Sequence, residues 1–219
     1  MNITDKITIT NEDNMLLMAR YPDNYFDLAI VDPPYGIDAD VKNSTDKMQT
    51  KKSATKSKKY GSQLWDSDIP NDEYFEELKR VSKKQIIWGA NYFGLVGGMI
   101  YWHKNVTMPT YSTGELAWVS WMNKLDFIDI AWHGMIQHDM KNKEIRIHPT
   151  QKPVALYKWI LDKYAKEGDK ILDTHLGSGS IAIACHDYGF ELTACELDKE
   201  YYDKAIQRIK NHVSQTKLF

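Results

Sequence analysis

The sequence predicts an α/β fold with one mostly parallel β-sheet, in which the order of the motifs is circularly permuted. With 219 residues, 42% of them apolar, the chain is long enough to form one substantial core. The apolar run YFDLAIVD, residues 25–32, has the length and character of a strand that is buried on both faces of a parallel sheet. The last third alternates strand, helix, strand and helix, which implies parallel pairing through right-handed crossovers.

The first third of the chain supplies strands and helices in turn. KITIT, residues 6–10, alternates and is β-branched, so we expect a short strand there, followed by a helix over residues 11–21. A second helix is expected over residues 71–83, NDEYFEELKRVSK, because its apolar residues recur at helical spacing. Acids come first in this segment and bases last, as the helix dipole favours.

The middle third has the composition of short strands rich in aromatic residues. Strands are expected in the segments QIIWGA, GGMIYWHK, ELAWVSW and LDFIDIAW, which contain five of the seven tryptophans. These five are Trp88, Trp102, Trp118, Trp121 and Trp132.

The last third has the clearest pattern. A helix is expected from Pro153 to Gly168, then a strand over KILDTH and a glycine turn over LGSGS. The helix IAIACHDYG, the strand FELTACELD and an amphipathic helix over residues 199–213 follow. Since no repeat and no long linker divides the chain, we expect a single domain over residues 1–219.

The charge is distributed unevenly along the chain. The formal net charge is −2, yet residues 42–59 contain seven lysines and one aspartate, a local charge of +6 that leaves −8 for the rest. A segment with this charge is expected to bind polyanions. It also has too few apolar residues for their burial to offset the loss of conformational entropy when the segment becomes ordered. We therefore expect a mobile lysine-rich loop over residues 39–62. Its lysines are Lys42, Lys47, Lys51, Lys52, Lys56, Lys58 and Lys59.

Several classes of protein are excluded by what the sequence lacks. The N-terminal residues MNITDKITIT do not have the pattern of a secretory signal, and no apolar run approaches the length of a membrane span. Cys185 and Cys195 give neither a disulfide framework nor metal-type spacing. His133, His138 and His148 fit no common zinc pattern, so no metal is expected. We expect a cytoplasmic protein that does not contact membranes.

The glycine turn indicates a cofactor that contains a nucleoside. Residues 177–182 have the form G-x-G-x-x-A between a strand and a helix, and Glu196 follows the next strand. Glycines let a ligand approach the backbone at a helix N-terminus, and the acid can accept hydrogen bonds from ribose hydroxyls. Only about 40 residues follow Gly179, too few for the second half of a dinucleotide fold. The remaining strands must then come from earlier in the chain, including the strand over residues 25–32. In such a permuted sheet, the end of that strand and the glycine turn lie at the same edge.

The stretch IVDPPYGIDAD, residues 30–40, ends a buried strand with an acid, two prolines and a tyrosine. Proline fixes φ and removes a backbone donor, so two in succession hold the main chain rigid and leave carbonyl oxygens available. Asp32 and the carbonyl group of Pro33 can thus be held as fixed hydrogen-bond acceptors beside the ring of Tyr35.

Four segments together resemble the beta arrangement of the DNA amino-methyltransferases. They are Asp32-Pro33-Pro34-Tyr35, then HPTQKP at residues 148–153, LDTHLGSGS and CELD. Their order matches that family, in which the catalytic motif precedes target recognition and the S-adenosylmethionine motifs come last. The resemblance implies a Rossmann-like S-adenosylmethionine-dependent methyltransferase fold, with S-adenosyl-L-methionine as the cofactor.

The resemblance also implies the site residues. Asp32, Pro33, Pro34 and Tyr35 match the catalytic motif, and Leu197 would pack on the cofactor's adenine. Thr150 is expected to cap the following helix, and Lys152 to add positive charge near the methionine carboxylate. His175 stands where the family commonly has phenylalanine. The cofactor-binding residues implied are His148, Thr150, Gln151, Lys152, Asp173, Thr174, Leu176, Gly177, Ser178, Gly179, Glu196 and Leu197.

Methyl transfer to an exocyclic amine requires this arrangement of acceptors, because the nitrogen lone pair is conjugated with the base. Acceptors against its two hydrogens favour tetrahedral nitrogen and stabilise the charge that develops. A base flipped out of the duplex also needs an aromatic surface, which Tyr35 offers. Methylation at cytosine carbon 5 is rejected because it needs an activated cysteine, and neither Cys185 nor Cys195 is placed to attack a base.

The aspartate that begins the motif favours adenine N6 by resemblance, with cytosine N4 as the alternative. Two other classes remain open: a nicotinamide-dependent oxidoreductase and a DNA-binding module without catalysis. The expected partner is double-stranded DNA, whose phosphates the lysine-rich loop would contact. A small target-recognition region is expected over about residues 100–147. A homodimer and a cognate restriction enzyme are further partners compatible with the resemblance.

Overall fold

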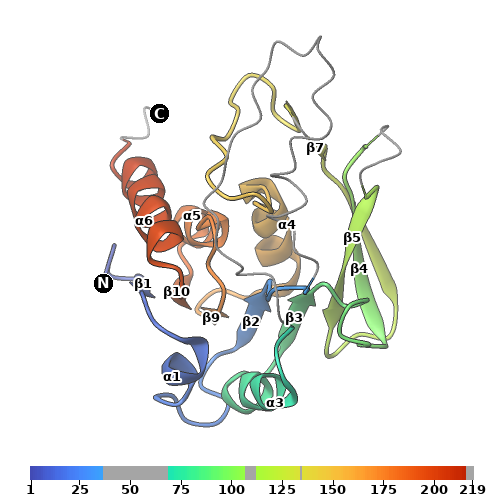
Figure 1. The fold of residues 1–219 in the computed structure, drawn as a ribbon, viewed down its shortest axis with the longest axis vertical. Helices are drawn as coiled ribbons and strands as arrows, with labels where there is room; N and C mark the ends of the chain where they lie inside the picture. The colour runs from blue at the N-terminus through green and yellow to red at the C-terminus, as the bar shows by residue number, and fades with distance from the viewer. Residues whose placement is uncertain (37–68, 107–111, 134, 216–219) are drawn as a thin grey trace.

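The computed structural model describes residues 1–36, 69–106, 112–133 and 135–215. Within these residues, eight strands form one sheet in the order β1-β10-β9-β2-β3-β5-β4-β6 (Figure 1). The sheet is parallel from β1 to β3 and between β4 and β6, and antiparallel where β5 pairs with β3 and β4. The predicted α/β fold with a mostly parallel sheet and permuted motif order is confirmed.

In the parallel half of the sheet, the strands lie in a different order from their order along the chain. Strands β2 and β3 are buried along their whole lengths, as expected for strands covered on both faces. Because all five strands run in the same direction, their carboxyl ends meet at one edge of the sheet. The strands are β1 (Ile7–Thr10), β10 (Glu191–Cys195), β9 (Lys170–Asp173), β2 (Leu28–Val31) and β3 (Gln85–Trp88).

The other end of the sheet comes from the middle of the chain. Strand β4 alternates between buried and half-buried residues, and β6 is the exposed edge strand. Outside the sheet, a two-stranded hairpin, which the sequence did not predict, follows β6. The strands are β4 (Gly98–His103), β5 (Gly114–Val119), β6 (Leu125–Asp129), β7 (Trp132–His133) and β8 (Ile136–Gln137).

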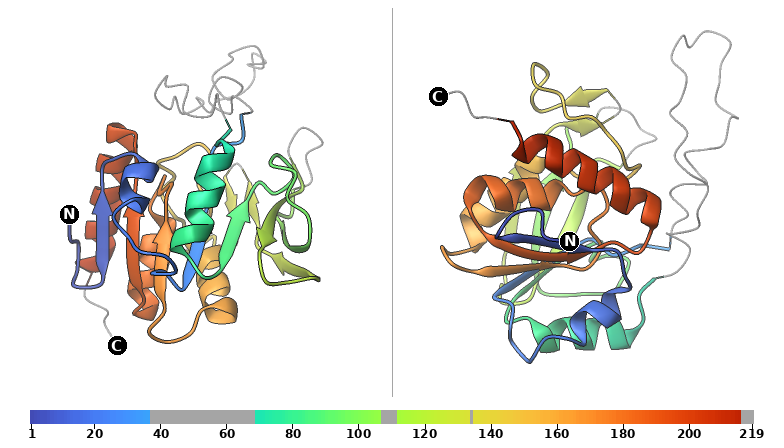
Figure 2. Two further views of the ribbon diagram at one scale, coloured as in Figure 1. Left: turned by 90° about the horizontal axis from the view of Figure 1, so that it is seen from below. Right: turned by 90° about the vertical axis from the view of Figure 1, so that its left-hand side faces the viewer.

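Helices cover both faces of the parallel half (Figure 2). On one face α4, α5 and α6 bury their apolar residues against Ile7, Ile30 and Trp88, and on the other α1 and α3 pack on Ala29 and Val31. This three-layer arrangement is how an open parallel sheet buries both of its faces. The helices are α1 (Asn14–Met18), α3 (Asp72–Val81), α4 (Val154–Tyr164), α5 (Ser180–Tyr188) and α6 (Lys199–Val213).

Side-chain caps fix where three of these helices begin. The carboxylate of Asp13 accepts from two backbone N–H groups of α1, Asn71 accepts from Tyr74 in α3, and Asp198 caps α6. Such caps satisfy donors that the helix itself leaves unpaired. Helix α5 ends at Gly189, whose φ of 76° is left-handed, as a C-terminal glycine commonly is.

Most predicted elements are confirmed, with two corrections to helix length. Helix α4 ends at Tyr164 and not at Gly168, since the chain turns extended at Ala165. Helix α1 spans only Asn14–Met18 of the segment predicted to be helical. The lysine-rich loop over residues 39–62 lies outside the described residues, and its mobility stays a prediction. Of the region about residues 100–147, three strands contribute to the main sheet.

None of the helices in the described parts of the chain is both long and apolar enough to cross a membrane.

Candidate functional site

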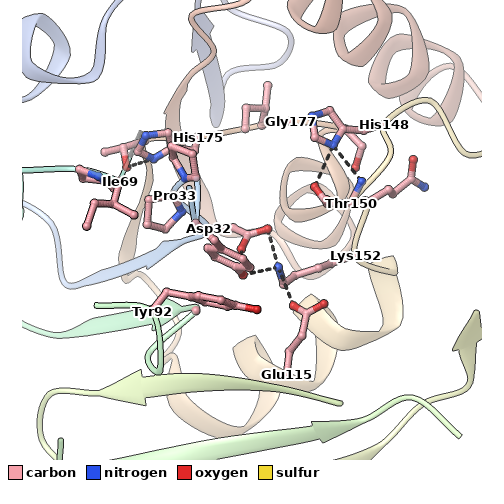
Figure 3. Close-up of a pocket in the computed structure, with 18 of the residues that line it drawn as sticks. Asp32, Pro33, Ile69, Tyr92, Glu115, His148, Thr150, Lys152, His175 and Gly177 are labelled. Atoms are coloured by element: carbon pink, nitrogen blue, oxygen red, sulfur yellow. Dashed lines mark hydrogen bonds and ion pairs between the residues drawn. The ribbon is translucent and has the colours of Figure 1, made fainter. Parts of the chain in front are cut away.

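A cavity of about 1200 Å³ lies at the carboxyl edge of the parallel strands. The residues after β2 and the glycine turn after β9 both line it, so the expectation that these two places share one edge of the sheet is confirmed (Figure 3). Asp32 and Gly177 lie on different parts of the cavity wall (Figure 3), and Tyr35 and Ser178 also line the cavity.

The turn after β2 holds an aromatic ring in a fixed place. The ring of Tyr35 stacks on Tyr92, with centroids 4.8 Å apart and planes 14° apart. It also lies against Gly89, where a Cβ atom would be only 2.3 Å from Tyr35 Cε1. Because Gly89 has φ of +78° as well, only glycine fits there without strain. The backbone directly after β3 and the ring of Tyr92 therefore position Tyr35.

Both carboxylate oxygens of Asp32 are engaged. The Tyr35 hydroxyl donates to Oδ1 at 2.5 Å, and the Lys152 ammonium lies 2.5 Å from Oδ2. Burial raises the pKa of Asp32, while the ammonium opposes that rise. Burial and the neighbouring carboxylate raise the pKa of Tyr35 well above its usual value, so its hydroxyl stays protonated and can donate. The arrangement presents a fixed carboxylate at the cavity wall.

Lys152 is almost completely enclosed, with 2% of its side chain exposed. Its Nζ also lies 3.0 Å from Glu115 Oε2, and it donates to the Tyr35 hydroxyl at 3.2 Å. Although burial opposes the charged form, Asp32 and Glu115 raise the pKa of Lys152. Lys152 therefore stays an ammonium, and its charge faces Asp32 and Glu115 (Figure 3). Its predicted contact with a methionine carboxylate stays a prediction.

Sequence reasoning missed Glu115 and its second partner, Lys104. Glu115 lies in β5 and Lys104 directly after β4, and their side chains form an ion pair. Burial opposes ionisation of Glu115, yet Lys104 and Lys152 lower its pKa to about 2. A carboxylate at the start of the apolar run LAWV was the only sequence signal that could have indicated it.

The glycine turn is held by the acid that follows the next strand. The N–H of Gly177 donates to Glu196 Oε2 at 2.8 Å, and that of Asp198 donates to Oε1 at 3.0 Å. Gly177 has φ of +53°, and a Cβ there would enter the space in front of His148, 4.0 Å from its ring. Burial raises the pKa of Glu196, and these backbone donors oppose that rise.

Two residues predicted to bind the cofactor, Asp173 and Gly179, are not among the described residues that line the cavity. Asp173 is 2% exposed, and its carboxylate accepts from the backbone N–H of His175 at 3.0 Å. Burial raises the pKa of Asp173 to about 8. A Cβ on Gly179 would lie 2.8 Å from Cδ1 of Ile209, so α6 packs directly on this glycine. In the described residues these two shape the turn, and their contact with a cofactor stays a prediction.

His175 connects the glycine turn to the other layer of the fold. Its Nε2 lies 3.0 Å from the Asn14 amide nitrogen, and its Nδ1 lies 3.0 Å from the Thr174 hydroxyl. Thr174 in turn contacts the Tyr74 hydroxyl at 2.7 Å, and burial lowers the pKa of His175 to about 4. A neutral imidazole thus occupies the place where phenylalanine was expected by resemblance.

The segment His148–Lys152 lines the cavity beside the glycine turn. Thr150 does not cap α4, which is a correction: Pro153 precedes the helix, and the Thr150 hydroxyl contacts His148 Nδ1 at 3.1 Å. Glu144 caps the helix instead, since its Oε1 accepts from the N–H of Val154 at 2.9 Å. Burial and the nearby lysines lower the pKa of His148 to about 3.

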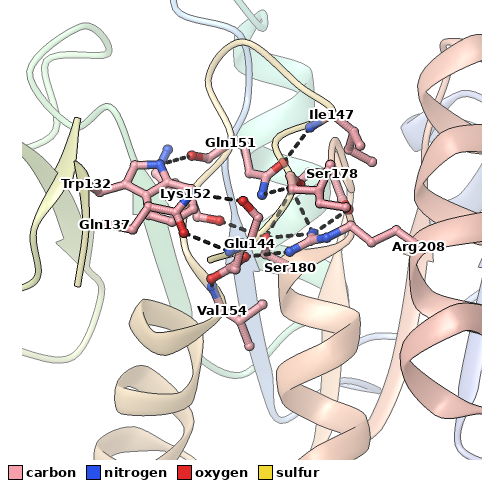
Figure 4. A network of polar contacts seen from close by, with 11 residues as sticks. Trp132, Gln137, Glu144, Ile147, Gln151, Lys152, Val154, Ser178, Ser180 and Arg208 are labelled. Atoms are coloured by element: carbon pink, nitrogen blue, oxygen red, sulfur yellow. Dashed lines mark hydrogen bonds and ion pairs between the residues drawn. The ribbon is translucent and has the colours of Figure 1, made fainter. Parts of the chain in front are cut away.

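A half-buried arginine joins this segment to the glycine turn (Figure 4). From α6, Arg208 donates to the carbonyl oxygen of Ser178 at 2.8 Å and to the Ser180 hydroxyl at 3.0 Å. It also pairs with Glu144 at 2.6 Å. The Ser180 hydroxyl donates to the carbonyl oxygen of Lys152 at 2.7 Å. One network therefore fixes the two segments relative to each other.

Some of the other predicted site residues line the cavity, and the rest lie outside the described residues. Pro33, Pro34, Gln151, Leu176 and Leu197 line the cavity, and Leu197 is 69% exposed. The side chain of Gln151 accepts from the N–H of Ile147 at 3.0 Å. All seven lysines of the predicted DNA-binding loop lie outside the described residues: Lys42, Lys47, Lys51, Lys52, Lys56, Lys58 and Lys59.

Neither a metal centre nor a reactive thiol is found in the described part of the chain. No group of three or more potential ligands is found there. Cys185 and Cys195 are both buried, and burial raises the pKa of each thiol. Neither cysteine is among the described residues that line the cavity, so the site lacks the nucleophile that carbon methylation needs.

Segments of the chain are similar to curated bacterial proteins. It is 37% identical over 68 residues to the type II methyltransferase M.HpaI of Haemophilus parainfluenzae, covering 31% of this chain and 22% of that protein. It is 37% identical over 89 residues to the probable type III restriction-modification enzyme HindVI Mod subunit of Haemophilus influenzae, covering 39% and 12%. The matched segments therefore span no more than about a quarter of the curated relatives.

The fold is similar to solved structures over nearly the whole chain. The M1.HpyAVI–SAM complex is matched with a TM-score of 0.57 and 20% identity, over 92% of this chain and 99% of that one. The cytosine-N4-specific PvuII DNA methyltransferase is matched with a TM-score of 0.59 and 12% identity, over 96% and 87%. At such identities the likeness establishes the shared fold.

The family assignment follows from a match over most of the chain. The model of the N6/N4 DNA methylase family, described as DNA methylase, matches residues 42–207. That range includes most of the cavity wall, from β3 to α6, and it exceeds half of the chain. The chain belongs to the N6/N4 DNA methylase family.

Proposed function

We propose that this protein transfers a methyl group from S-adenosyl-L-methionine to adenine N6 in DNA. One observation carries the proposal: the fixed carboxylate of Asp32 and the glycine turn at Gly177 line the same cavity. A methyl donor on the turn would then face an amino group held by Asp32. The family membership supports the same chemistry and argues against a nicotinamide-dependent oxidoreductase.

The residues of the glycine turn fit the proposed cofactor. The missing side chain of Gly177 leaves room beside His148 for a nucleoside, and Glu196 keeps lone pairs for ribose hydroxyls beyond its two backbone bonds. The exposed Leu197 can pack on adenine, while Thr150 and Gln151 line the side expected for the methionine end. When bound, S-adenosylmethionine supplies a methyl group on a sulfonium, whose carbon–sulfur bond breaks with its electron pair going to sulfur.

The residues of the turn after β2 act on the base. The Asp32 carboxylate and the Pro33 carbonyl oxygen accept the two amino hydrogens, which favours tetrahedral nitrogen as its lone pair bonds the methyl carbon. The Asp32 carboxylate can then take the extra proton from nitrogen and release it to water. Tyr35, backed by Tyr92, offers an aromatic surface near the flipped base.

Double-stranded DNA is the substrate in this proposal, in one domain over residues 1–219. The lysines of residues 42–59 would contact phosphates, and the region about residues 100–147 would contribute target recognition. The names of the curated relatives include a type II methyltransferase and a Mod subunit, which supports a role in restriction-modification. A homodimer, a cognate restriction enzyme and a cytoplasmic location belong to the same proposal.

Adenine is preferred because the motif begins with aspartate, while the solved structures of the same fold include a cytosine-N4-specific enzyme. Incubation of DNA with tritiated S-adenosylmethionine, followed by nucleoside analysis, tests the choice. We expect N6-methyladenine; N4-methylcytosine would replace the adenine assignment, and no labelled nucleoside would contradict the proposal.

The role of Asp32 is tested with Asp32→Ala. We expect the variant to lose methyl transfer by about 100-fold or more, as removal of one stabilising group at a transition state does. Affinity for S-adenosylmethionine, measured by calorimetry, should stay within about threefold, because the glycine turn is untouched. Equal losses of affinity and rate would mean that Asp32 holds the cofactor instead of the base.

A further inference from the structure

Four charged side chains of alternating sign form a row along the acceptor side of the cavity. The row runs Asp32, Lys152, Glu115, Lys104, and each member is in an ion pair with the next. The four come from four separate parts of the chain: the ends of β2 and β4, the strand β5, and the residue before Pro153. At most 22% of any of these side chains is exposed. We call this set the charge row.

Lys152 has oxygen atoms around it from three directions. Asp32 Oδ2 lies at 2.5 Å, Glu115 Oε2 at 3.0 Å and the Tyr35 hydroxyl at 3.2 Å. The ring of Trp88 lies beneath, with its centroid 5.2 Å from Nζ. The Glu115 oxygen that faces Lys152 is fully buried. The ammonium is therefore shared between two carboxylates and is not assigned to Asp32 alone.

The electrostatic consequence of this sharing concerns Asp32. A buried carboxylate and a buried ammonium alone attract each other strongly, because little solvent screens them. Asp32 would then be a weak acceptor for any third group. With Glu115 on its other side, the ammonium is drawn in two directions, and the charge row as a whole is neutral. Without Glu115 the row would carry +1 beside a nitrogen that is gaining positive charge.

We propose that Glu115 is a positioning residue: by holding Lys152 from the side opposite Asp32, it leaves the Asp32 carboxylate able to accept the amino group of the base. This inference rests on the proposed function of the same site. Lys104 holds Glu115 in turn, and the Lys104 ammonium lies 4.8 Å from the centroid of the Trp102 ring.

The pH dependence follows from the groups that face Lys152. Asp32 and Tyr35 face it from the turn after β2 and Glu115 from β5, and its charge also acts on Asp173 at the end of β9 and on His148 of its own segment. Tyr157 of α4 lies near Asp32 and Glu115. Asp32 and Glu115 raise the pKa of Lys152, and Glu115 raises that of Asp32. Removing the Glu115 charge should therefore move both limbs of the pH–rate profile to lower pH.

Glu115→Gln tests the proposal, with Glu191→Gln as the matched control. Glu191 is the first residue of β10, at the end of the strand opposite to the cavity, and is exposed. Methyl transfer to DNA is measured for both variants, and affinity for S-adenosylhomocysteine, which lacks the sulfonium charge, reports on the fold. We expect kcat to fall by about 10- to 100-fold in E115Q, with both pH limbs lowered, and to be unchanged in E191Q.

The double variant E115Q/K104Q separates positioning from an effect of net charge alone. It removes one charge of each sign, so the remaining row is neutral again, but Lys152 still has no carboxylate opposite Asp32, and kcat should stay within about threefold of that of E115Q. An E115Q variant that transfers methyl like E191Q, or a double variant whose kcat returns to the wild-type value, would overturn the inference. A wild-type protein that binds S-adenosylhomocysteine but methylates no DNA would overturn the proposed function as well, and the two failures are thus distinguishable.

Discussion

The two sides of the cavity are built by different physical means. The acceptor side, around Asp32, is held by full charges from distant segments, since Lys152 is 2% exposed and lies between Asp32 and Glu115. The cofactor side, at Gly177 and Glu196, is a backbone turn whose N–H groups and carbonyl oxygens are held by hydrogen bonds, to the Glu196 carboxylate and from Arg208. A substitution on the acceptor side should therefore affect the fold and the chemistry together, whereas one on the cofactor side should affect affinity more than stability at neutral pH.

The largest expected effect is that of Lys152→Met, which breaks the acceptor side. Removing one partner of a buried ion pair leaves uncompensated charge, so we expect the free energy of unfolding to fall by about 3–5 kcal/mol at pH 8. Burial then holds the pKa of Asp32 above its unfolded value, so protonation favours the folded variant and the loss should shrink as pH falls to 5. Urea unfolding at both pH values measures this.

Lys199→Met is the control for that prediction. Lys199 pairs with Asp203 on the surface of α6, with 65% of its side chain exposed. Such pairs contribute little, and we expect the free energy of unfolding to change by less than about 1 kcal/mol. If K152M is no less stable than K199M, the charge row does not support the fold.

The second largest effect is expected on the cofactor side, where a substitution of Glu196 should lower the affinity for S-adenosylmethionine. Glu196→Gln keeps an acceptor for Gly177 but removes the charge that a ribose would contact, so affinity for S-adenosylmethionine should fall by about 10- to 100-fold. The free energy of unfolding should fall by only about 1–2 kcal/mol, because the bond from the Gly177 N–H is preserved and only the bond from the Asp198 N–H is lost. Calorimetry and urea unfolding together test this separation, and a large loss of stability with unchanged affinity would reverse the comparison.

The smallest effect concerns the pH dependence of stability, through His175 on the cofactor side. His175 has its pKa lowered to about 4 by burial, below its unfolded value. Stability is therefore fully present above pH 6.5 and is lost as pH falls toward 4, because the unfolded chain binds the proton first. In His175→Phe the loss of stability between pH 7 and pH 5 should be smaller by about 1–2 kcal/mol. Thermal unfolding at both pH values provides the measurement; an unchanged loss would mean that His175 does not carry the acid sensitivity.

The parallel half of the fold could be predicted because its signals are local. YFDLAIVD and KILDTH are apolar runs of strand length, and Gly177 and Gly179 lie in a turn between a strand and a helix. The meeting of Asp32 and the glycine turn followed from topology alone, since the carboxyl ends of parallel strands share an edge.

The charge row could not be predicted, because it depends on pairings that no local pattern specifies. Glu115 meets Lys152 only because β5 lies antiparallel between β3 and β4, where Trp102 pairs with Glu115 in register. The ion pairs of Lys152 could not be predicted for the same reason. A lysine beside a helix start suggested an anion-binding role, which stays a prediction, whereas its two ion-pair partners come from elsewhere in the chain. The hairpin β7–β8 is too short for a periodic signal.

The pairing of β1 with β10 has a consequence for biosynthesis. Strand β1 finds its neighbour β10 only after all the other strands of the described sheet have been made. Until then the nascent chain carries apolar strands with open edges, which invite pairing with other chains. Sheets assembled from ends so distant in sequence also fold slowly. Yield from a heterologous host should therefore respond to chaperone supply and growth temperature more than to codon choice.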